Sequence, residues 1–270
     1  MSFKQKLSKL SGIKKELLPS SCQIVGNILL IKFMKIKSKK QKEKIAQAIM
    51  QMFPYIKTIC EIKQISGELR EPKIIKLLGN GTETIHKEHK ILYKIDVSKI
   101  MFSKGNLNER KRLVEKIKNN ETIVDMFAGI GYFSLGIAKF SKAKKIFAIE
   151  KNPIAFNYLK ENIKLNNIKN IETILADCRK ISIEEKPDRI IMGYFPNTEK
   201  FLPYALKMSK VGTIIHFHNT YRKNELWDKP IKEIENACKE MNLNFNILEK
   251  IKVKSFAPNV YHVVVDFQII

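Results

Sequence analysis

The stretch from Glu121 to Glu150, which reads ETIVDMFAGIGYFSLGIAKFSKAKKIFAIE, decides the fold of this chain. An apolar run from Thr122 to Val124 leads into the turn Asp125 to Gly131. A helix-like segment and a second apolar run follow, and the acidic residue Glu150 closes the stretch. This order predicts a strand, a glycine turn, a helix and a strand, which is the layout of a βαβ nucleotide-binding unit.

The turn itself indicates the kind of ligand. Gly129 and Gly131 permit a tight backbone path and leave no side chain between the backbone and a ligand. Glu150, at the end of the next strand, is placed to accept a ribose hydroxyl pair. A dinucleotide fingerprint would have Gly or Ala where this chain has Ser134, and the Asp125 carboxylate would repel a pyrophosphate. A cationic nucleoside without phosphate, such as S-adenosylmethionine, is therefore favoured.

The composition indicates a polyanionic partner. The 270 residues include 50 Lys and Arg against 27 Asp and Glu, a net charge of +23, which favours a nucleic acid over a neutral partner. A genome-wide bias toward Lys and Ile is the alternative explanation. The four cysteines are far apart in the sequence: Cys22, Cys60, Cys178 and Cys238. This spacing favours a reducing cytoplasm and argues against a metal site. We expect a cytoplasmic monomer without a membrane span or a signal peptide.

Two domains are predicted. Residues 1–98 form a small, basic α+β domain that holds RNA, and residues 99–270 form a Rossmann-like catalytic domain. The first domain should contain strands around the turn Gly26-Asn27, a helix from Lys39 to Phe53, and strands over 58–65 and 90–97. A basic run before and within this helix is either a phosphate-contacting surface or a solvated helix entry: Lys35, Lys37, Lys39, Lys40, Lys42 and Lys44.

The second domain should continue the sheet with strands over 171–175, 189–192 and 212–217. Asp177, just past the third strand, is placed to meet an adenine amine, although an ordinary turn aspartate is the alternative. His216 and His218 share one side of the fifth strand at its exit, and for each a structural role competes with a catalytic one. A helix and two strands, over 245–253 and 260–270, end the chain. We expect a mostly parallel sheet with an antiparallel last strand.

Four motifs carry a resemblance to a known family. They are Phe102-Ser103-x-x-Asn106-x-x-Glu109-Arg110, Asp125-Met126-Phe127-Ala128-Gly129-Ile130-Gly131, Glu150-Lys151-Asn152-Pro153, and Met192-Gly193-Tyr194 with His216-x-His218-Asn219-Thr220. From about residue 17 onward the chain resembles the archaeal tRNA wybutosine-synthesising protein 2 family, the sister of the tRNA guanine-N1 methyltransferases. The resemblance implies transfer of the 3-amino-3-carboxypropyl group of S-adenosylmethionine to carbon 7 of 4-demethylwyosine in tRNA for phenylalanine.

The resemblance also implies roles for single residues. Ser103 and Arg110 would hold the methionine carboxylate end or close the hinge over it, Glu150 would hold the ribose, and Asp177 with the Cys178 backbone would hold the adenine. The same motifs add further cofactor-binding candidates: Asp125, Phe127, Ala128, Gly129, Gly131, Lys151 and Asn152. Four residues are candidates for catalytic, base-facing groups: Lys104, Tyr194, His216 and His218. No metal ligand is expected.

Two departures choose between the sister families. The methyltransferase sister is expected to carry an Arg where this chain has Gly105, and an Asn-Leu-Pro-like turn where it has Gly193-Tyr194. An Asn amide would orient a purine edge for N-methylation, and glycine removes that group. Aminocarboxypropyl transfer is therefore favoured. Guanine methylation at the same nucleotide and a catalytically silent RNA-binding protein remain alternatives.

Overall fold

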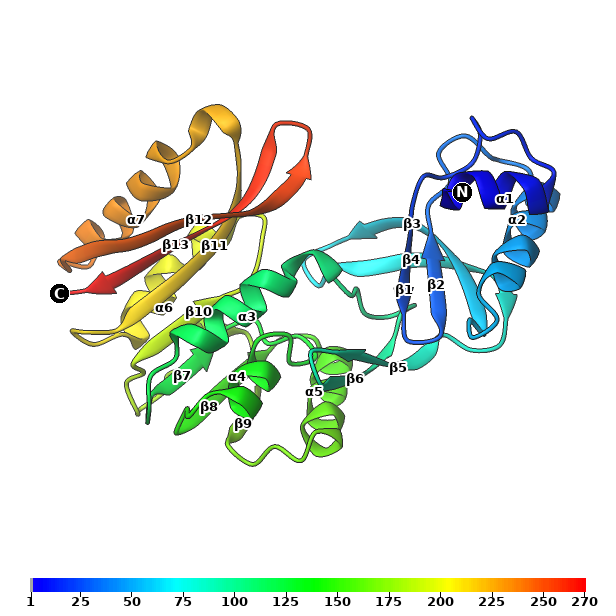
Figure 1. Cartoon of the computed structure of the whole chain (residues 1–270). Helices are drawn as coiled ribbons and strands as arrows, with labels where there is room; N and C mark the ends of the chain where they lie inside the picture. The colour runs from blue at the N-terminus through cyan, green and yellow to red at the C-terminus, as the bar shows by residue number, and fades with distance from the viewer. Residues whose placement is uncertain (1) are drawn as a thin grey trace. The chain divides into compact units, whose positions relative to one another are not determined.

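The chain divides into two compact units, one ending at Phe102 and one running from Ser103 to Ile270 (Figure 1). The computed structural model describes residues 2–270, apart from the side chain of Lys104. No helix in this described part has the length and apolarity needed to cross a membrane.

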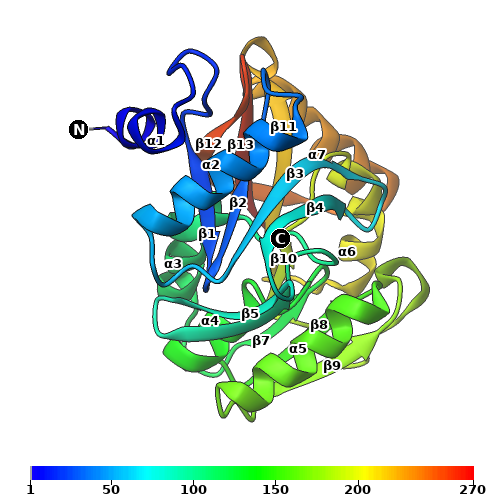
Figure 2. The same cartoon turned by 90° about the vertical axis from the view of Figure 1, so that its right-hand side faces the viewer.

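A four-stranded sheet covered by two helices forms the first unit. The strands lie in the order β1 (Cys22–Val25), β2 (Ile28–Ile31), β3 (Thr58–Ser66) and β4 (Glu71–Gly79). The helices α1 (Phe3–Ser11) and α2 (Lys39–Met52) pack on one face, and Figure 2 shows α2 lying across β1 and β2. The expected turn at Gly26-Asn27 and the expected helix from Lys39 are confirmed.

The helices of this unit follow from local sequence signals and from apolar packing. A capping box starts α1, because the Ser2 hydroxyl accepts from the Gln5 N–H and the Gln5 side chain accepts from the Ser2 N–H. Leu7, Ile45 and Ile49 are fully buried against the apolar side chains of the sheet. These contacts build a core separate from that of the second unit.

Two strands of the first unit were missed by the sequence analysis. No strand was expected between residues 65 and 90, whereas the structure has β4 and β5 (Glu83–Glu88) there. β5 forms a hairpin with β6 (Ile91–Asp96) through His89 and Lys90, both with positive φ. Such turns usually carry Gly or Asn, so this one gave no sequence signal.

The second unit is built on a seven-stranded sheet in the order β12-β13-β11-β10-β7-β8-β9. The parallel strands are β7 (Thr122–Asp125), β8 (Lys145–Glu150), β9 (Ile171–Leu175), β10 (Arg189–Met192) and β11 (Ile214–Arg222). The strand β13 (Val260–Ile269) runs antiparallel to both β11 and β12 (Phe245–Ala257). The expected sheet is confirmed, with antiparallel pairing confined to its β12-β13 end.

Helices cover both faces of this sheet (Figure 1). On one face lie α3 (Leu107–Lys116), α4 (Ser134–Phe140) and α5 (Pro153–Leu165), and on the other lie α6 (Leu202–Met208) and α7 (Asp228–Glu240). Successive strand residues point to opposite faces, so Ile123 packs with the first group and Val124 with the second. Short 3-10 turns complete the unit: η1 (Lys104–Asn106), η2 (Cys178–Lys180), η3 (Thr198–Phe201) and η4 (Lys223–Glu225).

Candidate functional site

The glycine turn lies at the point where the strand order of the sheet reverses. β7 is flanked by β8 on one side and by β10 on the other, and the turn follows the carboxyl end of β7. Ligands of open α/β sheets bind in this crevice. Gly129 and Gly131 have φ values of 58° and 99°, which are left-handed conformations that favour glycine.

Space around the turn also requires glycine. A Cβ on Gly129 would stand 2.7 Å from the Tyr132 ring, and a Cβ on Gly131 would stand 2.5 Å from the Leu135 side chain. Neighbouring side chains fill the space where a Cβ would stand, so both positions require glycine. This geometry fits a ligand that approaches the main chain itself.

Asp125 organises the turn from beneath. Its carboxylate is fully buried, accepts from the Ser134 hydroxyl at 2.5 Å and accepts from the Phe127 N–H at 3.3 Å. Burial raises the pKa of this carboxyl to about 6, although both hydrogen bonds oppose the rise. Asp125 therefore fixes the conformation of the turn. Because its carboxylate is fully buried, it could attract a bound cation only through electrostatic interaction across the backbone of the turn.

Glu150 bridges the glycine turn and the next helix. One carboxylate oxygen accepts from the Gly129 N–H at 2.7 Å, and the other accepts from the Asn152 N–H at 2.7 Å. Burial raises the pKa of Glu150, and these backbone N–H groups lower it in part. Each oxygen has a second lone pair, so a ribose hydroxyl pair can still be accepted. Asn152 in turn caps α5 through the Ile154 N–H at 2.9 Å.

Asp177 follows β9 and is held by cations. Its carboxylate accepts from the Arg179 guanidinium and the Arg179 N–H, and the Lys151 ammonium lies 3.0 Å away. The Arg179 hydrogen bond is the main reason why the pKa of Asp177 is lowered. Burial raises the pKa of the neighbouring Cys178 thiol to about 12, so this thiol is neutral. The Cys178 side chain is also buried.

An aromatic cluster lies beside the turn. The Phe127 and Tyr194 rings stack with centroids 5.0 Å apart, and Phe201 meets both edge-on. Tyr194 remains half-buried at the end of β10. A Cβ on Gly193 would stand 2.5 Å from the Phe133 ring, so packing requires glycine before Tyr194. The cluster gives the site a face suited to a planar base.

The start of the second unit brings Ser103 and Arg110 together. Arg110 donates to the Ser103 carbonyl at 2.9 Å, and its guanidinium lies 5.2 Å from the centre of the Tyr132 ring. Tyr132 directly follows Gly131, so Arg110 borders the glycine turn, and Ser103 is tied to the turn through Arg110. The side chain of Lys104 lies outside the described residues.

The fifth strand is longer than expected. We expected it to end at Phe217 and to exit through residues 216–220, whereas β11 continues to Arg222, paired with β13 throughout. Asn219 and Thr220 therefore lie within the strand. The prediction failed because β13 pairs with β11 beyond the end of β10, and this tertiary contact has no local sequence signal.

His216 is fully buried and engaged at both ring nitrogens. Nε2 lies 3.0 Å from Arg189, which can only donate, so Nδ1 carries the proton and donates to Asp266 at 2.6 Å. Burial lowers the pKa of His216 despite the nearby Asp266 carboxylate. Asp266 also accepts from Arg112 at 2.7 Å. This arrangement favours the structural role that the sequence left open for His216.

His218 is also fully buried, but its Nε2 makes no hydrogen bond. Its Nδ1 lies 3.2 Å from Nε2 of His262, and its Nε2 lies 3.7 Å from the Glu109 carboxylate. Burial, followed by the charges of the neighbouring histidines, lowers the pKa of His218 well below its usual value. A buried neutral imidazole inside this cluster favours a structural role as well.

Sequence reasoning missed the contribution of the C-terminal hairpin. Lys254 on β12 donates to the Ser103 hydroxyl at 3.1 Å, Phe256 packs on Phe195, and His262 lies 4.3 Å from the Phe195 ring centre. Lys254 lies 151 positions from Ser103 along the chain, so no spacing rule connects the two residues.

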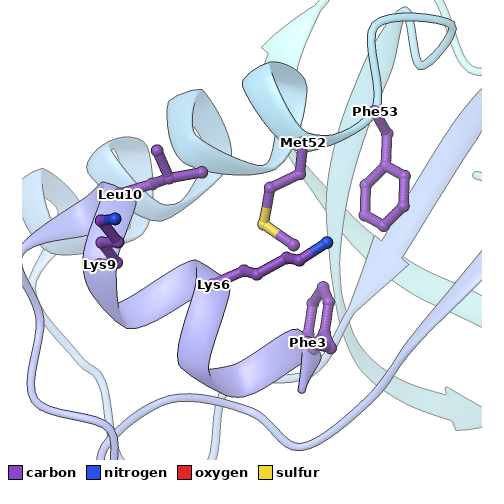
Figure 3. A pocket seen from close by; sticks show the side chains of 6 residues that line it. All are labelled: Phe3, Lys6, Lys9, Leu10, Met52 and Phe53. Atoms are coloured by element: carbon purple, nitrogen blue, oxygen red, sulfur yellow. The ribbon is translucent and has the colours of Figure 1, made fainter. Parts of the chain in front are cut away.

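The first unit has a pocket of its own. A pocket of about 500 Å³ in the first unit is lined by Phe3, Lys6, Lys9, Leu10, Met52 and Phe53 (Figure 3). It contains no residue of the glycine turn. Among residues 2–270, His, Cys, Asp and Glu form no group that could hold a metal ion.

The switch-point turn, the acid at the end of β8 and the parallel sheet with helices on both faces define a Rossmann-like nucleoside-binding domain. The chain belongs to the TRM5/TYW2 family: residues 84–247 match the TRM5/TYW2 methyltransferase domain and residues 3–82 match the TYW2 N-terminal domain.

Two relatives carry the same activity in their names, tRNA(Phe) (4-demethylwyosine(37)-C(7)) aminocarboxypropyltransferase. The protein from Methanocaldococcus jannaschii is 47% identical over 75% of this chain and 82% of its own length. The protein from Pyrococcus horikoshii is 39% identical over 94% of this chain and 91% of its own length.

Solved structures agree. P. horikoshii TYW2 in complex with MeSAdo superposes with a TM-score of 0.86 at 36% identity, covering 99% of both chains. The complex of aTrm5 and tRNALeu gives a TM-score of 0.88 at 34% identity, covering 100% of this chain and 78% of that one. Both members of the family therefore share the fold described above.

Proposed function

We propose that this chain transfers the 3-amino-3-carboxypropyl group of S-adenosylmethionine to carbon 7 of 4-demethylwyosine at position 37 of tRNA for phenylalanine. The observation that carries the proposal is the similarity to the P. horikoshii aminocarboxypropyltransferase over both units of the chain. The by-product of this reaction is methylthioadenosine, the small molecule named in the related P. horikoshii structure.

The reaction is a displacement at carbon. Carbon 7 of the base attacks the methylene carbon of the methionine arm that is bonded to the sulfonium. The carbon–sulfur bond breaks, its electron pair neutralises the sulfur, and methylthioadenosine leaves. The base then loses its carbon 7 proton. Because displacement requires an in-line approach, the orientation of the arm decides which carbon of the sulfonium reacts.

The described residues fit this donor. Glu150 accepts the ribose hydroxyls, and Asp177 with the Cys178 backbone receives the adenine. The bare backbone of the turn admits the nucleoside closely, and Ser103 with Arg110 borders the methionine arm. Tyr194, stacked on Phe127, offers the acceptor base an aromatic face. His216 and His218 hold the sheet behind these groups.

Packing at Gly193 supports carbon transfer over guanine methylation. The methylating sister is expected to carry an Asn amide at this position, yet any side chain at Gly193 would meet the Phe133 ring. Phe133 is nearly fully buried, so moving its ring aside would disrupt close packing and cost free energy. The site therefore lacks the amide that would orient a purine edge.

The test is the identity of the group added to the tRNA. Purified protein, S-adenosylmethionine and tRNA carrying 4-demethylwyosine are incubated, and the tRNA is digested for nucleoside mass spectrometry. We expect the mass of the aminocarboxypropyl adduct on the tricyclic base. A methyl adduct on the base would contradict the proposal. So would a protein that modifies only tRNA with an unmodified guanine at position 37.

The first unit supplies the tRNA-contacting surface in this proposal, with one correction to the sequence interpretation. Lys35, Lys37, Lys39, Lys40 and Lys44 are exposed, but Lys42 is buried and lies 3.0 Å from both oxygens of the buried Glu61 carboxylate. Lys42 therefore forms a buried ion pair with Glu61, and we exclude it from the lysines proposed to contact phosphate.

Replacing Lys37, Lys40 and Lys44 together by Gln should weaken tRNA binding and reduce its salt dependence. Each lost phosphate contact lowers the slope of log affinity against log salt by about 0.7 to 0.9. Filter binding over a range of salt concentrations measures this slope. Lys42→Met is the contrasting variant. It should lower the stability of the first unit, because the buried Glu61 carboxylate loses its buried lysine partner. An unchanged slope in the triple variant would remove this surface from the interface.

A further inference from the structure

Two cations from different elements meet at Ser103. The Arg110 guanidinium donates to the Ser103 carbonyl at 2.9 Å, and the Lys254 ammonium donates to the Ser103 hydroxyl at 3.1 Å. Arg110 comes from α3, near the start of the second unit, and Lys254 comes from β12, near its end. The chain therefore brings both positive charges to one serine through its tertiary fold.

Gly105 makes room for this arrangement. A Cβ on Gly105 would stand 2.6 Å from the Lys254 ammonium nitrogen and 2.7 Å from its Cδ. The lysine side chain thus runs directly against the Gly105 backbone on its way to Ser103. Because the obstructed atoms belong to the flexible end of a side chain, a larger residue at 105 would displace the lysine without disturbing the core.

This cationic corner adjoins the glycine turn. The Arg110 guanidinium lies over the Tyr132 ring, and that ring in turn covers Gly129. The Gly129 N–H is bonded to Glu150. Arg110 is thus linked to the glycine turn through Tyr132, and Lys254 joins Arg110 at Ser103.

We propose that Lys254 binds the carboxylate of the donor's methionine arm, and that Gly105 is the residue that allows it to do so. The inference rests on the proposed function. Ammonium and hydroxyl groups at one point form charge-assisted hydrogen bonds to a carboxylate. Since the arm is the group transferred, its anchoring fixes which carbon of the sulfonium faces the base.

The test compares donors with and without the carboxylate. Calorimetric titrations of the full chain use S-adenosylmethionine, decarboxylated S-adenosylmethionine and methylthioadenosine. The unchanged protein should prefer S-adenosylmethionine over the decarboxylated form. Lys254→Met should weaken S-adenosylmethionine binding about tenfold or more and leave the other two ligands unaffected. Gly105→Ala should reproduce this pattern, because its Cβ displaces the lysine.

Lys252→Met is the matched control, since Lys252 lies on the same strand and places its ammonium 4.3 Å from the Tyr261 ring centre. It should bind all three ligands normally. Retention of the carboxylate preference by Lys254→Met, or its absence in the unchanged protein, would overturn the inference while leaving the proposed reaction intact. Failure of the unchanged protein to bind any of the three would overturn the proposed function and this inference together.

Discussion

Glu150→Ala should raise the dissociation constant for S-adenosylmethionine about tenfold or more. The substitution removes the acceptor proposed for the ribose hydroxyls, and a hydrogen bond to a charged group contributes about 1.5 to 3 kcal/mol. It also releases the Gly129 and Asn152 N–H groups, which the carboxylate holds at 2.7 Å each. Both losses act in the same direction, and isothermal calorimetry measures their sum.

Methylthioadenosine should lose affinity to the same extent, because it retains the ribose and lacks only the arm. Glu172→Ala is the control: Glu172 is an exposed carboxylate on the adjacent strand β9, paired with Lys145 at 2.7 Å. It should bind both ligands normally. An unchanged dissociation constant in Glu150→Ala would place the ribose elsewhere.

Asp266→Ala should lower the free energy of unfolding of the second unit by about 3 to 5 kcal/mol. Asp266 is buried, accepts from His216 at 2.6 Å and accepts from Arg112 at 2.7 Å. Its removal leaves the Arg112 guanidinium without one of its carboxylate partners and frees the His216 Nδ1–H inside the protein. Urea unfolding followed by the fluorescence of Trp227, the single tryptophan, reports on this unit.

Glu249→Gln is the matched control, because Glu249 contacts the same Arg112 at 3.4 Å but is partly exposed to solvent. Exposed ion pairs contribute roughly 0 to 1 kcal/mol. A loss in Asp266→Ala as small as the one expected for Glu249→Gln would show that the buried network adds little to stability.

The stabilisation by Asp266 should depend on pH. Burial alone would raise its pKa, but His216 and Arg112 outweigh burial, so the pKa in the folded state is lowered. An acid with a lowered folded pKa contributes its full stabilisation above its unfolded pKa of about 3.9. The difference between the unchanged protein and Asp266→Asn should therefore be full near neutral pH and shrink as the pH falls below about 4.

The parallel half of the sheet could be predicted because its strands are short apolar runs, each followed by a turn or an acid. β9 and β10 have the bounds expected from the sequence. Glu150 and Asp177 stand where such strands end. This information is local, so it survives without knowledge of the tertiary structure.

The remaining features depend on contacts between distant segments. Asp125 reads as a ligand-facing acid, and Ser134 reads only as a departure from a dinucleotide fingerprint, whereas the fold joins them in one buried hydrogen bond. Gly105 reads as the loss of an arginine, whereas it is the space that Lys254 occupies. His218 reads as the exit of a strand that β13 extends. The partners of Gly105 and His218 lie too far along the chain for a spacing rule to find them, and the pairing of Asp125 with Ser134, nine residues apart, depends on the folded path of the turn.

The by-product of the reaction tests the central claim most directly. The protein is incubated with S-adenosylmethionine and tRNA carrying 4-demethylwyosine, and the released nucleoside is identified by chromatography. Transfer of the methionine arm leaves the methyl group on sulfur and predicts methylthioadenosine in amounts equal to the modified tRNA. Release of S-adenosylhomocysteine instead would show that the methyl group is transferred and would contradict the account.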